Sequence, residues 1–324
     1  MGILKLGIAC SLLFFLTLGA RVAQDIDHAA LASASDKGSF SELQDLIDES
    51  PGTTINLTMD YLSDNGDFPE GIKINKSLTI NGNNHIIDAD FRSRIFLTSS
   101  SNDIVLSNII FVNGKTDASG GAVKLEDGGK IINCTFISNH AADEGCAVYS
   151  MSNMRTENSA FENNSADIGG AISEWDSHVM DSVFTNNIAL HDGGAIFSNY
   201  GSVLKSNFAN NVAKGNGGAV YQLNGEVEMH GSVFMNNSAM HGGAIYQENG
   251  QTYSEGTFEG NHAEYCCDDI CHTYNHTKYG PSDNTTHNDS VNSNPYKSLD
   301  TDSENSTGNP LDIDAVSVCS CFKD

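Results

Sequence analysis

The sequence predicts an all-β protein: a right-handed parallel β-helix of roughly nine coils with a short N-terminal capping helix. The first observation is a repeated motif, in which a Phe is followed by two Asn, a Gly-Gly pair, an Ala and a β-branched residue. The second is its period of 23 to 26 residues, which is typical of a solenoid. The Phe of the motif recurs as Phe111, Phe136, Phe161, Phe184, Phe208, Phe234 and Phe258.

Inside one repeat the apolar residues alternate with a period of two, which indicates strands rather than helices. Ile132, Cys134 and Phe136, for example, fall on one face of a predicted strand. Short strands that occur once per coil can pair only with their copies in the neighbouring coils, and such crossovers favour a right hand. A single coil would not fold alone, because ordering costs about 1–2 kcal/mol per residue and only a few side chains are buried.

Alignment of the coils predicts columns of like side chains. Besides the inward Phe column, a small residue stands two positions before each Phe, in Cys134, Ser159, Ser182, Ser206, Ser232 and Gly256. The second Asn of each pair forms another column, in Asn139, Asn164, Asn187, Asn211, Asn237 and Asn261. Stacked amides at a bend can bond to one another and to the backbone, so we expect a structural role, with ligand contact as the alternative.

The ends of the chain differ from the repeats. Residues 1–23 are typical of a signal peptide, because the apolar run is too short to span a bilayer comfortably; an uncleaved anchor is the alternative. Residues 24–38 form a lead-in. Residues 39–50 predict an amphipathic helix that covers the first coil, with a capping box from Ser39 to Glu42. Its apolar stripe is expected to comprise Phe40, Leu43, Leu46 and Ile47.

The β-helix is expected to cover residues 51–275, followed by a polar linker at residues 276–310 and a Cys-containing segment at residues 311–324. No segment after the signal peptide is apolar enough to cross a membrane. The formal charge of −26 argues against nucleic-acid binding, which requires the opposite sign. Glycosylation sequons fit an exported chain and occur at Asn56, Asn75, Asn133, Asn163, Asn236, Asn275, Asn284, Asn288 and Asn305.

The cysteines gather near the C-terminus, where Cys266 and Cys267 are expected at the Gly-Gly positions of a terminal coil. In an exported protein this arrangement favours disulfides that join the tail to the last coil. A zinc site that includes His272 or His276, or free thiols, are the alternatives. The candidate disulfide residues are Cys266, Cys267, Cys271, Cys319 and Cys321.

Two further groups are candidate binding residues. Asp143, Asp167, His191 and Asp192 precede the Gly pairs of successive coils, and side chains about 5 Å apart on one ridge could hold Ca²⁺. A solvated polar edge is the alternative, and no other cofactor is expected.

An aromatic stripe follows the Ala of the motif, and strand alternation predicts that it faces outward as a sugar-binding platform. The alternative is that these rings cover neighbouring aliphatic surface. The stripe comprises Tyr149, Phe197, Tyr221 and Tyr246. No catalytic residue is expected, because acidic residues are dispersed and no nucleophile motif occurs; a polysaccharide lyase or hydrolase of the β-helix type is the alternative.

The Gly-Gly-Ala-Ile and Phe-x-x-Asn motifs resemble polymorphic outer membrane protein repeats. Residues 39–265 are still more similar to the adhesin-like surface proteins of methanogenic archaea, through the segments at residues 40–47, 74–88 and 94–96 and the later coils. The resemblance implies a secreted or cell-surface β-helix that adheres to glycans or to surface proteins. We therefore expect a non-catalytic adhesin-like protein that binds through its lateral face, with an enzyme or a purely structural wall protein as alternatives.

Overall fold

The computed structural model describes residues 37–64, 68–99, 103–253, 256–274 and 318–321. The chain divides into two compact units, Met1–Tyr274 with Val318–Asp324, and Asn275–Ser317. All the described residues belong to the first unit. The predicted signal peptide, nearly all of the lead-in and the polar linker at residues 276–310 lie outside the described residues.

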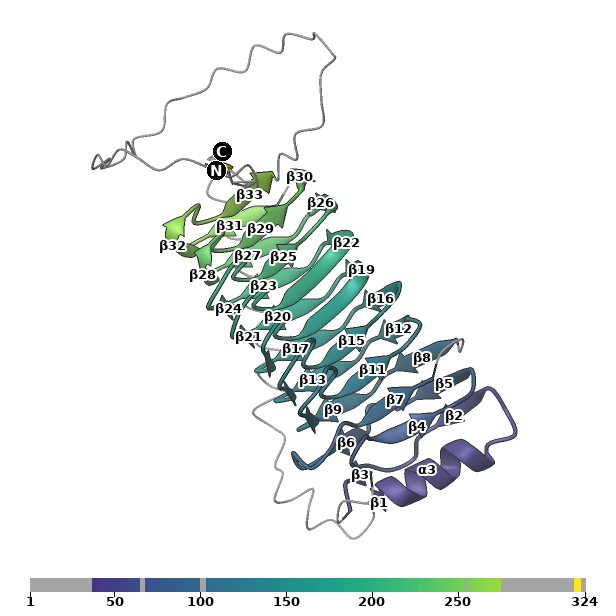
Figure 1. The fold of residues 1–324 in the computed structure, drawn as a ribbon. Helices are drawn as coiled ribbons and strands as arrows, with labels where there is room; N and C mark the ends of the chain where they lie inside the picture. The colour runs from purple at the N-terminus through teal and green to yellow at the C-terminus, as the bar shows by residue number, and fades with distance from the viewer. Residues whose placement is uncertain (1–36, 65–67, 100–102, 254–255, 275–317, 322–324) are drawn as a thin grey trace, which may run out of the picture. The chain divides into compact units, whose positions relative to one another are not determined.

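The first unit is a parallel β-helix of about nine turns, as the repeats predict (Figure 1). One face is a ten-stranded sheet that carries the Phe column, and a second is a seven-stranded sheet. The ten strands are β1 (Gly38–Ser39), β3 (Tyr61–Leu62), β6 (Ile86–Asp88), β9 (Ile110–Val112), β13 (Thr135–Ile137), β17 (Ala160–Glu162), β20 (Val183–Thr185), β23 (Asn207–Ala209), β27 (Val233–Met235) and β31 (Thr257–Glu259). The seven are β10 (Lys115–Thr116), β14 (His140–Ala141), β18 (Ser165–Ala166), β21 (Ile188–Ala189), β24 (Val212–Ala213), β28 (Ser238–His241) and β32 (His262–Cys266).

The remaining 17 strands form one sheet from two ladders, which join through the nine-residue strands β19 (Ile172–Met180) and β22 (Ile196–Leu204). The first ladder also contains β4 (Ile72–Ile74), β7 (Phe96–Thr98), β11 (Val123–Leu125), β15 (Val148–Ser150), β25 (Val220–Gln222), β29 (Ile245–Glu248), β33 (Ile270–Tyr274) and β34 (Val318–Cys321). The second also contains β2 (Thr54–Asn56), β5 (Leu78–Asn81), β8 (Ile104–Ser107), β12 (Gly129–Ile132), β16 (Met154–Glu157), β26 (Gly225–Glu228) and β30 (Gly250–Tyr253).

The predicted Phe column forms the centre of the core. From Phe111 to Phe258 the rings stack in register, with centroids 4.7–5.1 Å apart and interplanar angles of 2–12°. All but Phe258 are buried, and Phe258 packs against the core from its end. The spacing of the rings equals the spacing of hydrogen-bonded strands, so each ring covers the face of the next.

The Asn pairs form the bend that follows this sheet. The first Asn has a positive φ, as at Asn186 (φ 55°), which Asn tolerates better than most residues. The second Asn is buried and forms the predicted ladder: its side-chain nitrogen donates to the side-chain oxygen of the next Asn over 2.9–3.0 Å, from Asn139 to Asn261. The structural interpretation of this column is therefore confirmed.

The small-residue column forms a second ladder. The backbone N–H of Ser159 donates to the hydroxyl oxygen of Ser182 over 3.1 Å, and that of Ser182 donates to Ser206 over the same distance. The hydroxyls of Ser159, Ser182 and Ser206 each donate to a carbonyl two residues earlier, as Ser182 does to Met180, whereas that of Ser232 donates to the carbonyl of Val203. Cys134 stands in this column and is buried, so the column does not require a hydroxyl; the coil before it places Ile109 at the same register position.

The Gly pair is required by close contact between coils. Gly193 has φ +67°, and a Cβ on Gly194 would lie 2.0 Å from the carbonyl oxygen of Gly218 in the next coil. A Cβ at Gly194 would therefore clash with the backbone of the next coil.

The capping helix is α3 (Phe40–Glu49), and both bonds of the Ser39–Glu42 capping box are present. It lies at the first coil (Figure 1), where the side chain of Gln44 bonds to both the N–H and the C=O of Lys73, like the backbone of an adjacent strand. Two details differ from the prediction. Leu46 is 38% exposed and is not part of the buried stripe, and Gly38 already pairs with Tyr61, so the helix is inserted within the first coil.

The last coil is shifted by one residue from the prediction. A bulge between Ala239 and His241 pairs His241 with Cys266. The amide of Gly242 consequently bonds to the carbonyl of Cys266, and Cys267, with φ +62°, occupies the first Gly position while Asp268 occupies the second. Residues 318–321 then pair antiparallel with β33.

Candidate functional site

The predicted aromatic residues lie in one outward-facing column on β15, β19, β22, β25 and β29. The strand register aligns Tyr149, Ser173, Phe197, Tyr221 and Tyr246. The residues that precede them on these strands are buried β-branched side chains. The register therefore places a serine within a column that is otherwise aromatic between Tyr149 and Tyr246.

Three of the four predicted rings stack on one another. Phe197 and Tyr221 have centroids 5.1 Å apart, and Tyr221 and Tyr246 have centroids 5.2 Å apart. Tyr221 is only 6% exposed and donates its hydroxyl to Glu248, and its burial, followed by this contact, raises the pKa of its hydroxyl. The hydroxyl of Tyr246 bonds to Thr273 over 3.0 Å. These two tyrosines therefore offer little free ring surface.

Tyr149 stands apart from this stack, because Ser173 leaves a gap in the column. The gap is a pocket of about 290 Å³, which we call the lateral groove. Its apolar surface includes Trp175 and Met151, which are 61% and 56% exposed. The groove is lined by Glu144, Tyr149, Ser150, Met151, Ser173, Glu174, Trp175, Phe197, Asn199 and Leu223.

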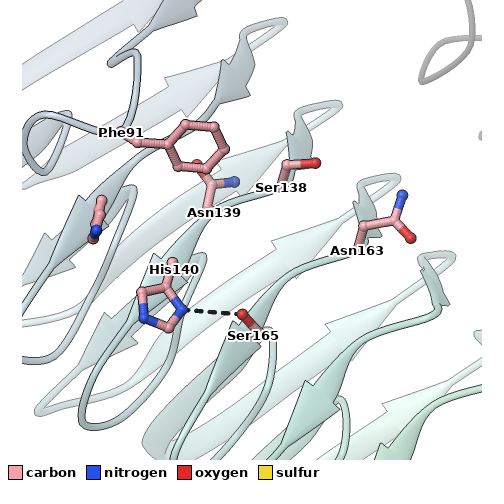
Figure 2. A pocket seen from close by; sticks show the side chains of 7 residues that line it. Phe91, Ser138, Asn139, His140, Asn163 and Ser165 are labelled. Carbon is pink, nitrogen blue, oxygen red and sulfur yellow. Dashed lines mark hydrogen bonds between the residues drawn. The ribbon is translucent and has the colours of Figure 1, made fainter.

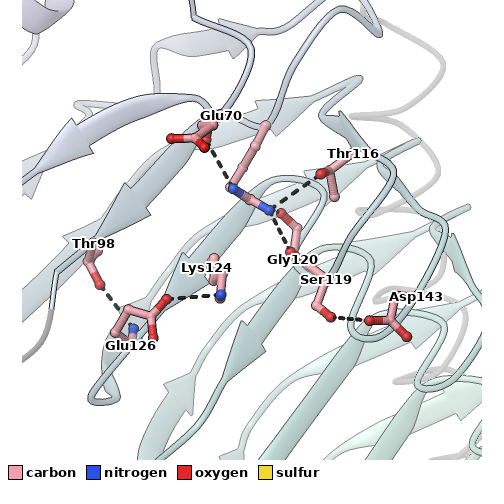
Figure 3. Close-up of polar contacts among 9 residues, drawn as sticks. Glu70, Thr98, Thr116, Ser119, Gly120, Lys124, Glu126 and Asp143 are labelled. Atoms are coloured by element: carbon pink, nitrogen blue, oxygen red, sulfur yellow. Dashed lines mark hydrogen bonds and ion pairs between the residues drawn. The ribbon is translucent and has the colours of Figure 1, made fainter.

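The polar groups of the lateral groove include two carboxylates, those of Glu144 and Glu174. The hydroxyl of Ser173 donates to Glu144 over 2.9 Å, and Glu174 is a carboxylate that is only 3% exposed. Outside the groove, the ammonium of Lys124 lies 5.8 Å from the centroid of the Tyr149 ring. It is paired at 2.9 Å with Glu126 (Figure 3). The groove thus combines aromatic surface with negative charge.

Within the described residues, the candidate calcium residues do not form a group of three or more converging ligands. Asp143 accepts a bond from Ser119 over 3.0 Å (Figure 3), and Asp167 contacts His191 at 2.6 Å. Asp192 accepts a bond from the amide of Asn216 over 2.7 Å, and burial raises the pKa of its carboxyl. Within the described ranges, the only set of three or more candidate metal ligands that converge is made of cysteines.

Two other pockets offer less aromatic surface for a ligand than the lateral groove does. One, of about 310 Å³, has a single apolar ring, that of Phe91 (Figure 2). In the same pocket the Nδ1 of His140 lies 3.0 Å from the hydroxyl of Ser165. Its Asn139 already belongs to the Asn ladder. The other, of about 470 Å³, is lined by polar, glycine and aliphatic residues between Asp103 and Arg155.

The cysteine set comprises Cys266, Cys267 and Cys271, and we call it the cysteine triplet. The sulfurs of Cys266 and Cys267 are 2.8 Å apart, and those of Cys266 and Cys271 are 3.8 Å apart. His272 is 5% exposed and follows Gln247 in an inward-facing column, so it does not join the triplet, and burial lowers the pKa of its imidazole. His276 lies outside the described residues.

Sequence reasoning missed the residues that give the lateral groove its shape. Trp175, the single tryptophan of the chain, lies two residues after Ser173 and therefore on the same face of β19. Strand alternation could have identified Trp175. The aligned repeats did not identify it, because Ser173 and Trp175 occur at these positions in one coil only.

The described sequon asparagines, Asn56, Asn75, Asn133, Asn163 and Asn236, are all exposed.

A search of the described helices finds none with the length and apolar character to cross a membrane.

No curated protein and no solved structure shows a significant match to the chain. The family model of the Chlamydia polymorphic membrane protein repeat matches residues 181–199 and 205–222. These segments contain the Phe, Asn and Gly positions of two successive coils, so over these coils the chain is similar to the polymorphic membrane protein repeat. The similarity to archaeal adhesin-like proteins stays a prediction.

Proposed function

We propose that the protein is a non-catalytic adhesin-like β-helix that works at the cell surface or after secretion and binds glycans through its lateral groove. The observation that carries the proposal is the gap at Ser173, with Tyr149 on one side, Phe197 on the other and Trp175 beside it. The similarity to a polymorphic membrane protein repeat supports a location at the cell surface.

The dimensions of the gap suit one sugar ring. Tyr149 and Phe197 are two coils apart, which corresponds to about 10 Å at the usual strand spacing. Aromatic rings pack against flat partners at centroid distances of about 4.5–7 Å, so one ring-sized group fits between them. Trp175 and Met151 extend the apolar surface toward solvent and could contact a neighbouring residue of the same glycan.

The charge of the groove favours neutral or amino sugars over uronate or sulfated sugars. The carboxylate of Glu144 would repel an anionic ligand, and the formal charge of −26 acts in the same direction at longer range. The carboxylate of Glu144 can accept hydrogen bonds from hydroxyl or ammonium groups. A surface protein that carries such glycans would bind through the same groove.

A glycan array tests the proposal. The wild-type protein should bind neutral or amino-sugar glycans, and Trp175→Ala and Phe197→Ala should each weaken binding about tenfold or more through lost stacking. Tyr265→Ala is the matched control, because Tyr265 is 65% exposed on β32 and outside the groove. Binding that survives both groove substitutions, or no binding to any glycan, would overturn the proposal; the latter result favours a purely structural wall protein.

The carbohydrate-active enzyme is a second candidate, and one observation favours it. Two carboxylates, Glu144 and Glu174, are among the groove-lining residues, and glycoside hydrolysis uses such a pair, although both carboxylate oxygens of Glu174 are buried. Incubation with neutral and uronate polysaccharides distinguishes the two functions. New reducing ends or unsaturated products that disappear in Glu174→Gln would favour the enzyme, whereas binding without product favours the adhesin.

A further inference from the structure

The C-terminal end of the β-helix brings together cysteines that are far apart in sequence. The cysteine triplet comes from the last coil, with its three sulfurs all within 4.8 Å of one another. The strand β34 pairs antiparallel with β33, so that Cys321 is the register partner of Cys271 and Cys319 is the partner of Thr273. Five cysteines of a 324-residue chain thus lie in one small region.

The backbone arrangement suits a covalent bond. Residues directly opposite one another in an antiparallel pair have Cα atoms about 4.5–5.5 Å apart, which falls within the range that a disulfide accepts. Cys271 itself is fully buried although its column faces outward on the preceding coils, and Cys266 lies against it. The triplet therefore lies at β33, and the tail strand β34 pairs with this strand.

We propose that at least one disulfide joins the cysteine triplet to Cys319 or Cys321 and closes this end of the β-helix. Two thiols lose two protons and two electrons as the S–S bond forms. Glutathione disulfide or a disulfide of another protein accepts the two electrons and the two protons, and it is thereby reduced to two thiols. Because the triplet sulfurs all lie within 4.8 Å of one another, thiol–disulfide exchange can move the bond among Cys266, Cys267 and Cys271.

The bond has a clear structural purpose. A parallel solenoid ends in a strand whose outer edge is unpaired, and β34 covers that edge on β33. The strand begins 44 residues after the end of β33, and holding so distant a segment in place costs loop-closure entropy. A disulfide removes most of that cost from folding, since it closes the same loop in the unfolded chain.

Peptide mapping of the full-length protein under non-reducing conditions, after equilibration with glutathione disulfide, tests the proposal. The expected product links a peptide containing the triplet to a peptide containing residues 318–321. Reductant should lower the melting temperature by about 5–10 °C. The double variant Cys319→Ser, Cys321→Ser should melt at that lower temperature with or without reductant.

Cys134→Ser is the control, because serine fills the same column position in the coils that follow, from Ser159 to Ser232, and this variant should keep the full response to reductant. Mapping that finds the tail cysteines reduced after oxidation would overturn the proposal. So would a stoichiometric zinc ion, released by acid from the untreated protein, whose loss accompanies blocking of the triplet. Neither result depends on glycan binding, so the two proposals can fail separately.

Discussion

The side-chain amide of Asn164 donates a hydrogen bond of 3.0 Å to the side-chain oxygen of Asn187, one coil further along the β-helix. The same oxygen accepts a bond of 3.1 Å from the backbone N–H of Asn164, and the second proton of the Asn164 amide reaches the carbonyl of Phe136. One buried asparagine therefore satisfies backbone groups that the bend removes from the strand ladders. Repetition of this unit makes the bend a continuous polar network beside the Phe stack.

Asn187→Ala is expected to lower the free energy of unfolding by about 2–4 kcal/mol. The change leaves the two donors of Asn164 and the carbonyl of Phe161 without their partner, in a place that water does not reach. Urea denaturation measures the difference. Asn186→Gly is the control, because Asn186 is exposed with φ 55°, which Gly adopts freely; it should change stability by less than about 1 kcal/mol. Equal losses in both variants would contradict the ladder's role.

Gly194→Ala is expected to be among the most destabilising single methyl additions in the chain, at about 3 kcal/mol or more. The new Cβ would lie 2.0 Å from the carbonyl oxygen of Gly218 and 2.7 Å from the carbonyl carbon of Val212, and both are backbone atoms that cannot rotate away. Gly52→Ala is the matched control, since its nearest neighbour is an ordinary 3.9 Å away. Thermal unfolding of the two variants should differ by several degrees; a fully stable Gly194→Ala would show that the coils can separate at little cost.

These two positions also show which features sequence reasoning can predict. Phe184, Asn187 and Gly194 recur at corresponding places in successive coils, so the alignment of repeats identifies both their columns and their roles. The one-residue shift at Cys267 could not be predicted, because a bulge inserts a residue without changing the local composition. The lateral groove was missed for the opposite reason: Ser173 breaks the pattern in a single coil, and only the register of three strands shows what that break exposes.

Glu162 predicts a dependence of stability on pH. Its carboxyl is 9% exposed and one of its oxygens, Oε2, is buried without a partner, so burial raises the pKa of Glu162, an effect that a bond from Asn163 opposes in part. A raised folded-state pKa means that the native protein binds more protons than the unfolded chain between pH 4.5 and the raised value. Wild-type stability should therefore fall as pH rises through that window.

Glu162→Gln removes this effect and is expected to raise the free energy of unfolding by about 1 kcal/mol at pH 7, with the gain disappearing near pH 4. Denaturant titrations at several pH values give the measurement. Glu259→Gln serves as the control, because Glu259 stands in the same column but is exposed, and it should produce little change at either pH. A gain in Glu162→Gln that is constant with pH would assign the effect to packing rather than to charge.

Ser173→Tyr offers the sharpest separation of fold from function. The new ring would enter the column between Tyr149 and Phe197, as Tyr221 lies between Phe197 and Tyr246, and its hydroxyl could reach Glu144 as that of Tyr221 reaches Glu248. Because the neighbouring rings already accept such a stack, the melting temperature should stay the same or rise. Glycan binding should nevertheless be lost, since the ring occupies the space proposed for the sugar. Ser173→Ala keeps the gap open and should retain binding, so a Tyr variant that binds as well as the Ala variant would place the ligand elsewhere on the lateral face.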